Sequence, residues 1–364
     1  FGRRAQMTHA PRASSFLVVG KLSGSNSAQE SLYAPLCSDK HQLQESLLAL
    51  GYTDYWHGFT QAWFCSLSKD PKLAKRSREA ATYKYSGQAD LQPYAIDKAL
   101  SGGRVLSIVG DSLADQQFLS LFCLLGRVVN MSSIGNRAFS LASGGRVQHV
   151  RTDFLVDARH ALGLVAVDGL PLLRQTDGSY RSHQLRASRE DRAWAPRLRY
   201  GQEGAADLLL LATGAHWPTH SLDVARFASL MPQVLEAVRV AGFAGQILYR
   251  TLFAPGCGTQ PQNNRTAFLQ PSAPYGWAMY QEIDRQAAAL GLAESNASQS
   301  QTAQWRIINV SVATSQRVDG HCGECHAATP GGTRGYDCLH FCLVPGGPVD
   351  LWNAALFENI THFS

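Results

Sequence analysis

The sequence lacks both a long apolar segment and a concentration of positive charge. Its longest apolar runs, near residues 15–20 and 208–212, are far shorter than the roughly 20 residues that cross a bilayer as a helix. No run of lysine and arginine is interleaved with aromatic residues, and the formal net charge is only +5. We therefore expect no nucleic-acid partner. The sequence begins at Phe1 rather than at methionine, which leaves open a signal peptide or membrane anchor outside it.

Several widespread motifs are also missing. The sequence contains no G-x-S-x-G, no Walker A pattern and no G-x-G-x-x-G. These absences exclude the usual α/β-hydrolase nucleophile, a P-loop nucleotide hydrolase and a dinucleotide-binding domain.

Cysteines and sequons indicate the compartment. The eight cysteines are an even number, as a set of disulfides requires, and they accompany five N-x-[ST] tripeptides. This combination predicts a luminal or secreted protein; chance tripeptides in a chain with buried thiols are the alternative. The predicted glycosylation sites are Asn130, Asn264, Asn296, Asn309 and Asn359.

Composition and periodicity divide the chain into four parts. Residues 1–30 are rich in small residues and predict a loosely ordered arm. Residues 31–95 have no clean period and predict an irregular lobe tied down by disulfides. Residues 96–358 form the expected catalytic domain, with a polar insertion over 174–204. Residues 359–364 remain as a C-terminal tail.

Within the main domain, apolar strands alternate with amphipathic helices. The segment 206–214 (ADLLLLATG) is nearly all apolar, as in a strand covered on both faces. The alternation predicts an α/β fold, a three-layer α/β/α domain with a central parallel sheet. Strands are expected at 104–109, 127–131, 147–156, 206–214, 246–251 and 305–312, and helices at 113–125, 221–240, 275–290 and 350–357.

Ser112 lies where an α/β enzyme would carry a nucleophile. In the sequence IVGDSL, residues 108–113, a strand ends at Gly110 and a helix starts close to Ser112. The carboxyl ends of parallel strands form active sites, and the N–H groups of a helix N-terminus stabilise an oxyanion. The alternative is that Ser112 only caps the helix, and Asp111 likewise could be a capping or surface carboxylate.

A candidate base and its orienting acid lie near the C-terminus. Asp337 and His340 are three residues apart, so both can face one way on a turn or short helix. One imidazole nitrogen would accept the serine proton while the other donates to the carboxylate. Cross-links from Cys338 and Cys342 would hold the base in place.

Together, the two segments resemble the trichome-birefringence-like, or PC-esterase, proteins. These are GDSL/SGNH-related polysaccharide O-acetyltransferases of plant-type cell walls. The matching blocks, which span about residues 95–358, are GDSLADQQ (110–117), TGAHW (213–217), ILYRT (247–251) followed by Cys257, RVDGHCG (317–323) and DCLHFCLVPGGPVDLWN (337–353). The resemblance implies an SGNH-hydrolase-like fold, with Ser112, His340 and Asp337 as its catalytic triad.

The sequence departs from the family pattern in the C-terminal block, by one extra Val and a Gly-Gly in place of a single Gly, and two other departures bear on catalysis. Ala212 or Thr213 replaces the asparagine of the family's NTGHW, and Asp115 replaces the asparagine that often follows GDS. Backbone N–H groups of Ser112 and Gly135 are then the candidates for the oxyanion hole. Loss of one such donor costs about 3 kcal/mol in other enzymes.

Five further residues are candidates for substrate binding. His216 and Trp217 follow a strand end, so Trp217 is placed to stack on a sugar, although a packed core tryptophan is the alternative. Arg250 could hold an acidic sugar or a catalytic loop. Asp319 and His321 belong to the RVDGHCG block, and His321 either lines the acceptor cleft or forms a hydrogen bond in the core.

The cysteines allow several pairings. In the HCGECH stretch, a local disulfide is favoured over a zinc site, which remains the alternative. We expect neither a resident metal nor a cofactor, only an acetyl donor as co-substrate. The favoured pair is Cys322–Cys325. The resemblance implies a bond between Cys257 and Cys338 and another from Cys342 to the N-terminal lobe at Cys65. These pairs leave Cys37 with Cys123.

These observations lead to three functional hypotheses. The leading one is an O-acetyltransferase of the secretory pathway, in the Golgi lumen or at the cell surface, that forms an acetyl-serine and transfers it to a polysaccharide or glycoprotein glycan. The second is a carbohydrate O-acetylesterase with the same triad and water as the acceptor. The third, from another class, is a non-catalytic glycan-binding or structural glycoprotein that kept the fold.

Overall fold

The computed structural model describes the chain in sections. These are residues 18–21, 37, 39–50, 52, 63–64, 83–86, 93–126, 129–135, 137–152, 155, 207–215, 224–240, 243, 245–253, 279–297, 305–315, 317, 320–326 and 335–361. In some of these elements, among them residues 321–326 and 335–338, only the backbone is described.

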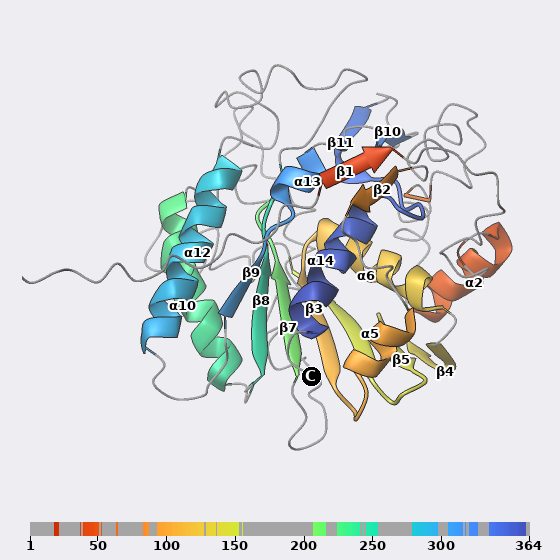
Figure 1. Cartoon of the computed structure of the whole chain (residues 1–364), viewed down its shortest axis with the longest axis horizontal. Helices are drawn as coiled ribbons and strands as arrows, with labels where there is room; N and C mark the ends of the chain where they lie inside the picture. Colours follow the sequence, from red (N-terminus) through yellow and green to blue (C-terminus); the bar gives the residue numbers. More distant parts are fainter. Residues whose placement is uncertain are drawn as a thin grey trace, which may run out of the picture.

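A seven-stranded sheet forms the centre of the molecule, in the order β4-β5-β6-β3-β7-β8-β9 (Figure 1). Five neighbouring strands pair in parallel, and two antiparallel strands extend the sheet beyond β6. The predicted parallel sheet is confirmed, with an antiparallel edge. The strands are β3 Val105–Gly110, β4 Val129–Gly135, β5 Ala138–Leu141, β6 Arg146–Arg151, β7 Leu208–Ala212, β8 Gln246–Arg250 and β9 Trp305–Ile308.

Helices cover both faces of this sheet. Helix α6 (Ser112–Leu125) leads from β3 toward β6, whereas α10 (Val224–Val240) and α12 (Tyr280–Ala297) lead in the opposite direction across the sheet. Right-handed crossovers therefore place α6 on the face opposite α10 and α12. Helix α14 (Pro348–Thr361) packs on α6, and Figure 1 shows the two groups of helices on either side of the strands. The three-layer α/β/α prediction is confirmed.

The strand order marks the edge where a site can form. The neighbours of β3 are β6 on one side and β7 on the other, so the connections diverge at β3. Doubly wound sheets bind ligands at such a switch point, outside the carboxyl ends of the strands. Both β3 and β7 are buried along their whole length, because helices cover them on both faces. Ser112 follows β3 directly at this edge.

The N-terminal region contains more regular structure than its composition predicts. Helix α2 (Lys40–Ala49) lies in the expected irregular lobe, and the Asp39 side chain caps it by accepting from the N–H of Gln42 at 2.9 Å. Leu43 and Leu47, four residues apart, are its buried contacts. Helix α5 (Pro93–Ala99) closes the lobe, and strand β1 (Val18–Lys21) of the expected arm pairs antiparallel with β2 (Tyr83–Ser86).

The C-terminal region also differs from the prediction. The segment with Asp337 and His340 is not a turn or short helix but strand β11 (Gly335–Phe341), because the antiparallel strand β10 (His321–His326) supplies its backbone partners. The strand expected over 305–312 ends at Ile308 and is followed by helix α13 (Ser311–Ser315). The expected tail begins inside α14.

Disulfides tie the N-terminal region to the main domain. Cys37 and Cys123 are bonded, which confirms this predicted pair and fixes the segment before α2 to helix α6. Cys342 is also disulfide-bonded, to a partner outside the described residues. Cys65, the predicted partner of Cys342, and Cys257, the predicted partner of Cys338, both lie outside the described residues. Among the described helices, none has the length and apolar character of a membrane span.

Candidate active site

Ser112 and His340 meet at the carboxyl edge of the sheet, although 228 residues separate them in the sequence. The Ser112 Oγ and His340 Nε2 atoms lie 2.7 Å apart, within hydrogen-bond distance. Ser112 is the first residue of α6, and His340 is the sixth residue of β11. Both are nearly buried, with exposures of 4% and 7%. The sequence-predicted nucleophile and base therefore stand in the relation that acyl transfer requires.

Asp111, rather than Ser112, caps the helix. Its Oδ1 accepts a hydrogen bond from the backbone N–H of Leu113 at 2.9 Å, and its backbone is extended, as at an N-cap. The alternative interpretation of Ser112 as a cap is wrong. Capping leaves the Ser112 hydroxyl available for His340.

Gly110 lets β3 end close against β7. A Cβ atom at this position would lie 1.9 Å from the carbonyl oxygen of Ala212. The N–H of Asp111 donates to that same carbonyl at 3.4 Å. The glycine of the GDS motif thus permits the close backbone approach that sets the start of α6.

Gln116 connects the helix of Ser112 to the strand of His340. Its Nε2 donates to the carbonyl oxygen of Phe341 at 2.6 Å, and its Oε1 accepts from the Phe341 N–H at 3.1 Å. Gln116 lies one helical turn after Ser112, and Phe341 directly follows His340. Because the side chain is buried, these two bonds have no competition from solvent. Gln116 therefore fixes the distance between the two elements that carry Ser112 and His340.

A second polar cluster attaches the C-terminal helix to α6. Asp350 accepts from the Ser120 hydroxyl and from the N–H of Gly346 at 2.8 Å. The amide of Asn353 donates to the same Ser120 hydroxyl at 2.9 Å. All three side chains are buried. The acid and amide of the PVDLWN block thus hold α14, and with it the end of the β11 segment, against the nucleophile's helix.

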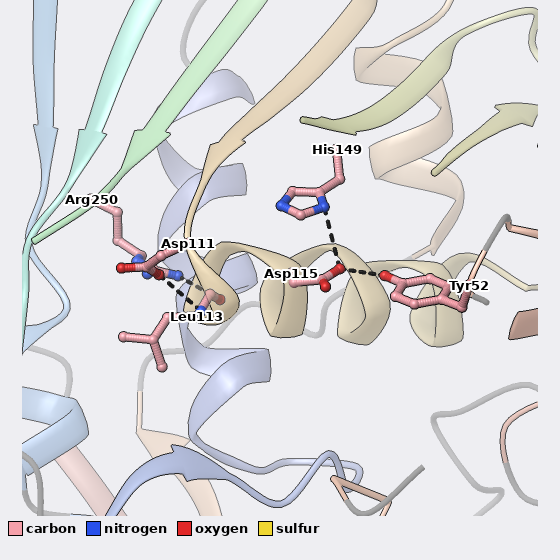
Figure 2. A network of polar contacts seen from close by, with 6 residues as sticks. All are labelled: Tyr52, Asp111, Leu113, Asp115, His149 and Arg250. Carbon is pink, nitrogen blue, oxygen red and sulfur yellow. Dashed lines mark hydrogen bonds and ion pairs between the residues drawn. The ribbon is translucent and has the colours of Figure 1, made fainter. Parts of the chain in front are cut away.

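Arg250 supports the helix and does not bind substrate. Its exposure is only 1%, its Nη1 donates to Gln117 Oε1 at 2.8 Å and to the carbonyl oxygen of Leu113 at 3.3 Å, and its guanidinium lies over the ring of Trp352. Burial lowers the pKa of Arg250 to about 10, and the negative charge of Asp111 opposes that shift. Figure 2 shows Arg250 and Asp111 together at the start of α6. The predicted contact with an acidic sugar is wrong, since solvent does not reach the side chain.

A buried network underlies the next turn of α6. The hydroxyl of Tyr52 donates to Asp115 Oδ1, and His149 Nδ1 lies 3.2 Å from the same oxygen (Figure 2). Burial lowers the pKa of His149 from its ordinary 6.5 to about 3, so the imidazole is neutral at physiological pH. Burial alone would raise the pKa of Asp115, but its charged and hydrogen-bonding neighbours, including Arg137 and Tyr52, together lower it. Asp115, which replaces the family's asparagine, therefore has a structural carboxylate role.

Trp63 packs against the imidazole ring of His340. Its ring stacks on that of His340, with centroids 5.3 Å apart and planes at 29°. The carbonyl oxygen of Trp63 accepts from the N–H of Leu343 at 2.7 Å. Sequence reasoning missed both Trp63 and Gln116. Gln116 lies in the GDSLADQQ block, but its bond to Phe341 cannot be read from the block, and Trp63 lies in no recognisable motif.

Gly135 cannot contribute to the oxyanion hole. It pairs with Ala138, which pairs with Gln148, which in turn lies level with Ser107 in the middle of β3. Three strand spacings of about 4.8 Å put Gly135 roughly 14 Å from β3. The prediction is wrong because β4 lies at the far edge of the sheet. The backbone N–H of Ser112, at the N-terminus of α6, remains a candidate donor.

The other predicted residues are only partly tested. Asp337 lies on β11 with His340, but its side chain is outside the described part. The same holds for His321, Cys322, Cys325 and Cys338, so neither the local disulfide nor the zinc alternative is decided; the described side chains contain no metal-binding group of three. His216, Trp217 and Asp319 lie outside the described residues.

The sequons differ in accessibility. Asn309 is exposed after β9, whereas Asn359 is half-buried on α14 and its amide donates to the Ala355 carbonyl at 2.8 Å. Asn309 is therefore the better acceptor of a glycan. Asn130 lies on β4 and Asn296 on α12, with side chains outside the description, and Asn264 is not among the described residues.

We predict that Gln116→Met lowers both activity and stability. The substitution removes both hydrogen bonds between the Gln116 side chain and the buried backbone of Phe341, at about 1–3 kcal/mol per bond, and frees β11 to shift. A displacement of about 1 Å costs roughly 100-fold in rate. Thermal unfolding and the acylation rate of Ser112 measure the two effects. Gln233→Met, at an exposed position of α10, is the control and should change neither.

We predict that His149 makes the protein sensitive to acid. Its pKa is about 3 when folded and about 6.5 when unfolded, so the unfolded chain binds more protons between these values. Stability therefore falls as the pH decreases from 6.5 toward 3, by up to about 1.4 kcal/mol per pH unit. Chemical denaturation of wild type and His149→Gln at pH 7.5 and 5 should show a smaller acid-induced loss in the variant.

The comparison between variants is needed because Asp284 acts in the opposite direction. Burial raises the pKa of this carboxyl to about 7. Its contribution to the free energy of unfolding therefore falls as the pH rises from about 4 to 7. His41→Gln, at an exposed histidine on α2, is the matched control. An equal pH slope in wild type and His149→Gln would contradict the assignment of His149.

Comparison with known proteins gives the family of the C-terminal part. Residues 224–359 match the model of PC-Esterase, described as a GDSL/SGNH-like Acyl-Esterase family found in Pmr5 and Cas1p. The match contains His340 but begins after Ser112, which the fold brings to His340. A comparison with curated proteins gave no significant match. Over residues 224–359, the chain is therefore similar to the PC-esterase family of GDSL/SGNH-like acyl-esterases.

Proposed function

We propose that this protein is a serine-dependent glycan O-acetyltransferase that works through an acetyl-serine intermediate. The observation that carries the proposal is the 2.7 Å contact between Ser112 Oγ and His340 Nε2. Its position at the carboxyl edge of a parallel sheet and the acyl-esterase family of the C-terminal part support acyl chemistry.

The reaction proceeds by double displacement. Ser112 Oγ attacks the acetyl carbonyl of the donor as its proton passes to His340 Nε2. The tetrahedral intermediate collapses, the donor oxygen or sulfur leaves with that proton, and acetyl-Ser112 remains. A sugar hydroxyl then attacks the ester carbonyl and gives its proton to His340. Ser112 leaves with this proton, so the enzyme returns to its starting state.

Local charge favours this pathway. The N–H of Ser112 lies at the N-terminus of the 14-residue helix α6, where the helix dipole and free N–H groups stabilise the oxyanion. The N–H of Leu113 already donates to Asp111, so the second donor comes from another segment. Asp337 orients His340 and stabilises the imidazolium, as the third member of the triad.

Water access distinguishes transfer from hydrolysis. Ser112 and His340 are nearly buried, and exclusion of water protects an acyl-enzyme until a sugar hydroxyl arrives. Carbohydrate O-acetylesterase activity is the second candidate, favoured by the description of the matched family as acyl-esterases. It uses the same steps with water as the acceptor.

We place this activity in the secretory pathway, on a polysaccharide or glycoprotein glycan. The Cys37–Cys123 bond and the bonded Cys342 support an oxidising compartment. The exposed sequon at Asn309 is compatible with a glycoprotein.

We predict that an activated acetyl ester or a fluorophosphonate labels Ser112. Peptide mass spectrometry should find the adduct on Ser112 in the wild type and no adduct in Ser112→Ala. The label should be at least about 1000-fold slower in His340→Ala, since the base is lost. Ser101→Ala, at an exposed serine, is the control and should label normally. A folded wild-type protein that takes no label would rule out the enzyme and favour a glycan-binding role.

We further predict that Asp337→Asn slows acylation with little effect on folding. The corresponding change in a serine-protease triad lowers kcat about 10⁴-fold, because the imidazole takes the wrong tautomer. The rate of Ser112 acylation and the thermal unfolding midpoint give the two readings. A rate equal to that of wild type would reduce the triad to a Ser112–His340 pair.

A further inference from the structure

The catalytic histidine is in contact with a residue outside the matched family segment. The indole of Trp63 stacks on the imidazole of His340, with centroids 5.3 Å apart, whereas the match covers only residues 224–359. Trp63 is 1% exposed, so the contact is inside the protein. The N-terminal lobe therefore reaches the centre of the active site.

Two attachments hold Trp63 in this position. The hydrogen bond from the Leu343 N–H to the Trp63 carbonyl joins its backbone to the segment that follows His340. Phe64, the next residue, is also buried in the core. The backbone of Trp63 is therefore anchored to the segment that directly follows the strand of His340.

The geometry gives the indole an electronic effect on acyl transfer. His340 becomes an imidazolium each time it takes a proton from Ser112 or from the acceptor. The face of an indole is the strongest cation–π partner among the side chains, and it acts within about 6 Å of the ring centroid. The charge develops in the transition state, so this attraction lowers the barrier rather than only tightening the ground state.

We propose that Trp63 is a positioning residue for this reaction, which holds the His340 ring toward Ser112 and stabilises its protonated form through the indole face. The N-terminal lobe is then a part of the active site and not only a cover. This inference rests on the proposed acyl-transfer function. It requires that the rate of acyl transfer depend on the aromatic face of the side chain at position 63, and not only on the volume that this side chain fills.

The first experiment compares Trp63→Phe and Trp63→Leu in the full chain. The rate of Ser112 acylation by an activated acetyl ester is measured per folded molecule, well below the unfolding midpoint. Loss of a cation–π contact predicts a rate about two- to thirtyfold lower in Trp63→Leu, with Trp63→Phe in between because phenyl retains a weaker π face. Trp305→Leu is the matched control, since Trp305 is a buried tryptophan on β9 that stacks on Tyr249. It should acylate as fast as wild type.

A second experiment separates the electronic effect of the indole from its packing. It tests the proposal even if Trp63→Leu does not fold. The seven tryptophans are replaced biosynthetically by mono-, di- and trifluorinated tryptophan, which withdraw electron density from the ring face with little change of shape. The logarithm of the acylation rate should fall stepwise with each fluorine in the wild type and stay flat in Trp63→Phe.

The outcomes are distinct from those of the proposed function. A wild type that never labels Ser112 overturns the acyl-transfer proposal itself. A wild type that labels Ser112 through His340, but whose rate is unchanged by fluorination, or falls equally in Trp63→Leu and Trp305→Leu, overturns the role of Trp63 alone.

Discussion

The arrangement of the site depends on one constraint, the hydrogen-bond distance between Ser112 and His340, which lie on two elements far apart in the sequence. One residue starts helix α6 and the other lies on strand β11. A reacting pair must be held to within a fraction of an ångström. The surrounding contacts are best understood by how they keep these two elements at that distance.

Three buried side chains provide this support from different sides. Gln116 bonds both backbone groups of Phe341 and so connects α6 to β11 directly. Arg250, on β8, bonds Leu113 and Gln117 in the first two turns of α6. Asp350 attaches α14 to the same helix. A buried polar group without a partner costs more than its bond contributes, so each contact fixes one arrangement rather than several.

The N-terminal lobe takes part in this arrangement. The Cys37–Cys123 bond and the Tyr52–Asp115 hydrogen bond fix it to α6, and the Trp63 carbonyl fixes it to the segment after β11. It therefore contacts both elements that carry the candidate catalytic residues, α6 and the segment of β11. This explains how a part of the chain with no recognisable motif can matter for a site whose motifs lie elsewhere.

The sequence by itself determined the α/β class, the position of Ser112 at a strand end and the choice of His340 as base, because hydrophobic periodicity and short motifs are local properties. Only the tertiary structure decided that β4 lies at the edge of the sheet, which removes Gly135 from the site, and that Arg250 is buried under α6. It also brought Gln116 to the backbone of Phe341 and Trp63 to the ring of His340. Such contacts join residues far apart in the chain. They depend on how whole helices and strands pack together, so local sequence patterns do not predict them.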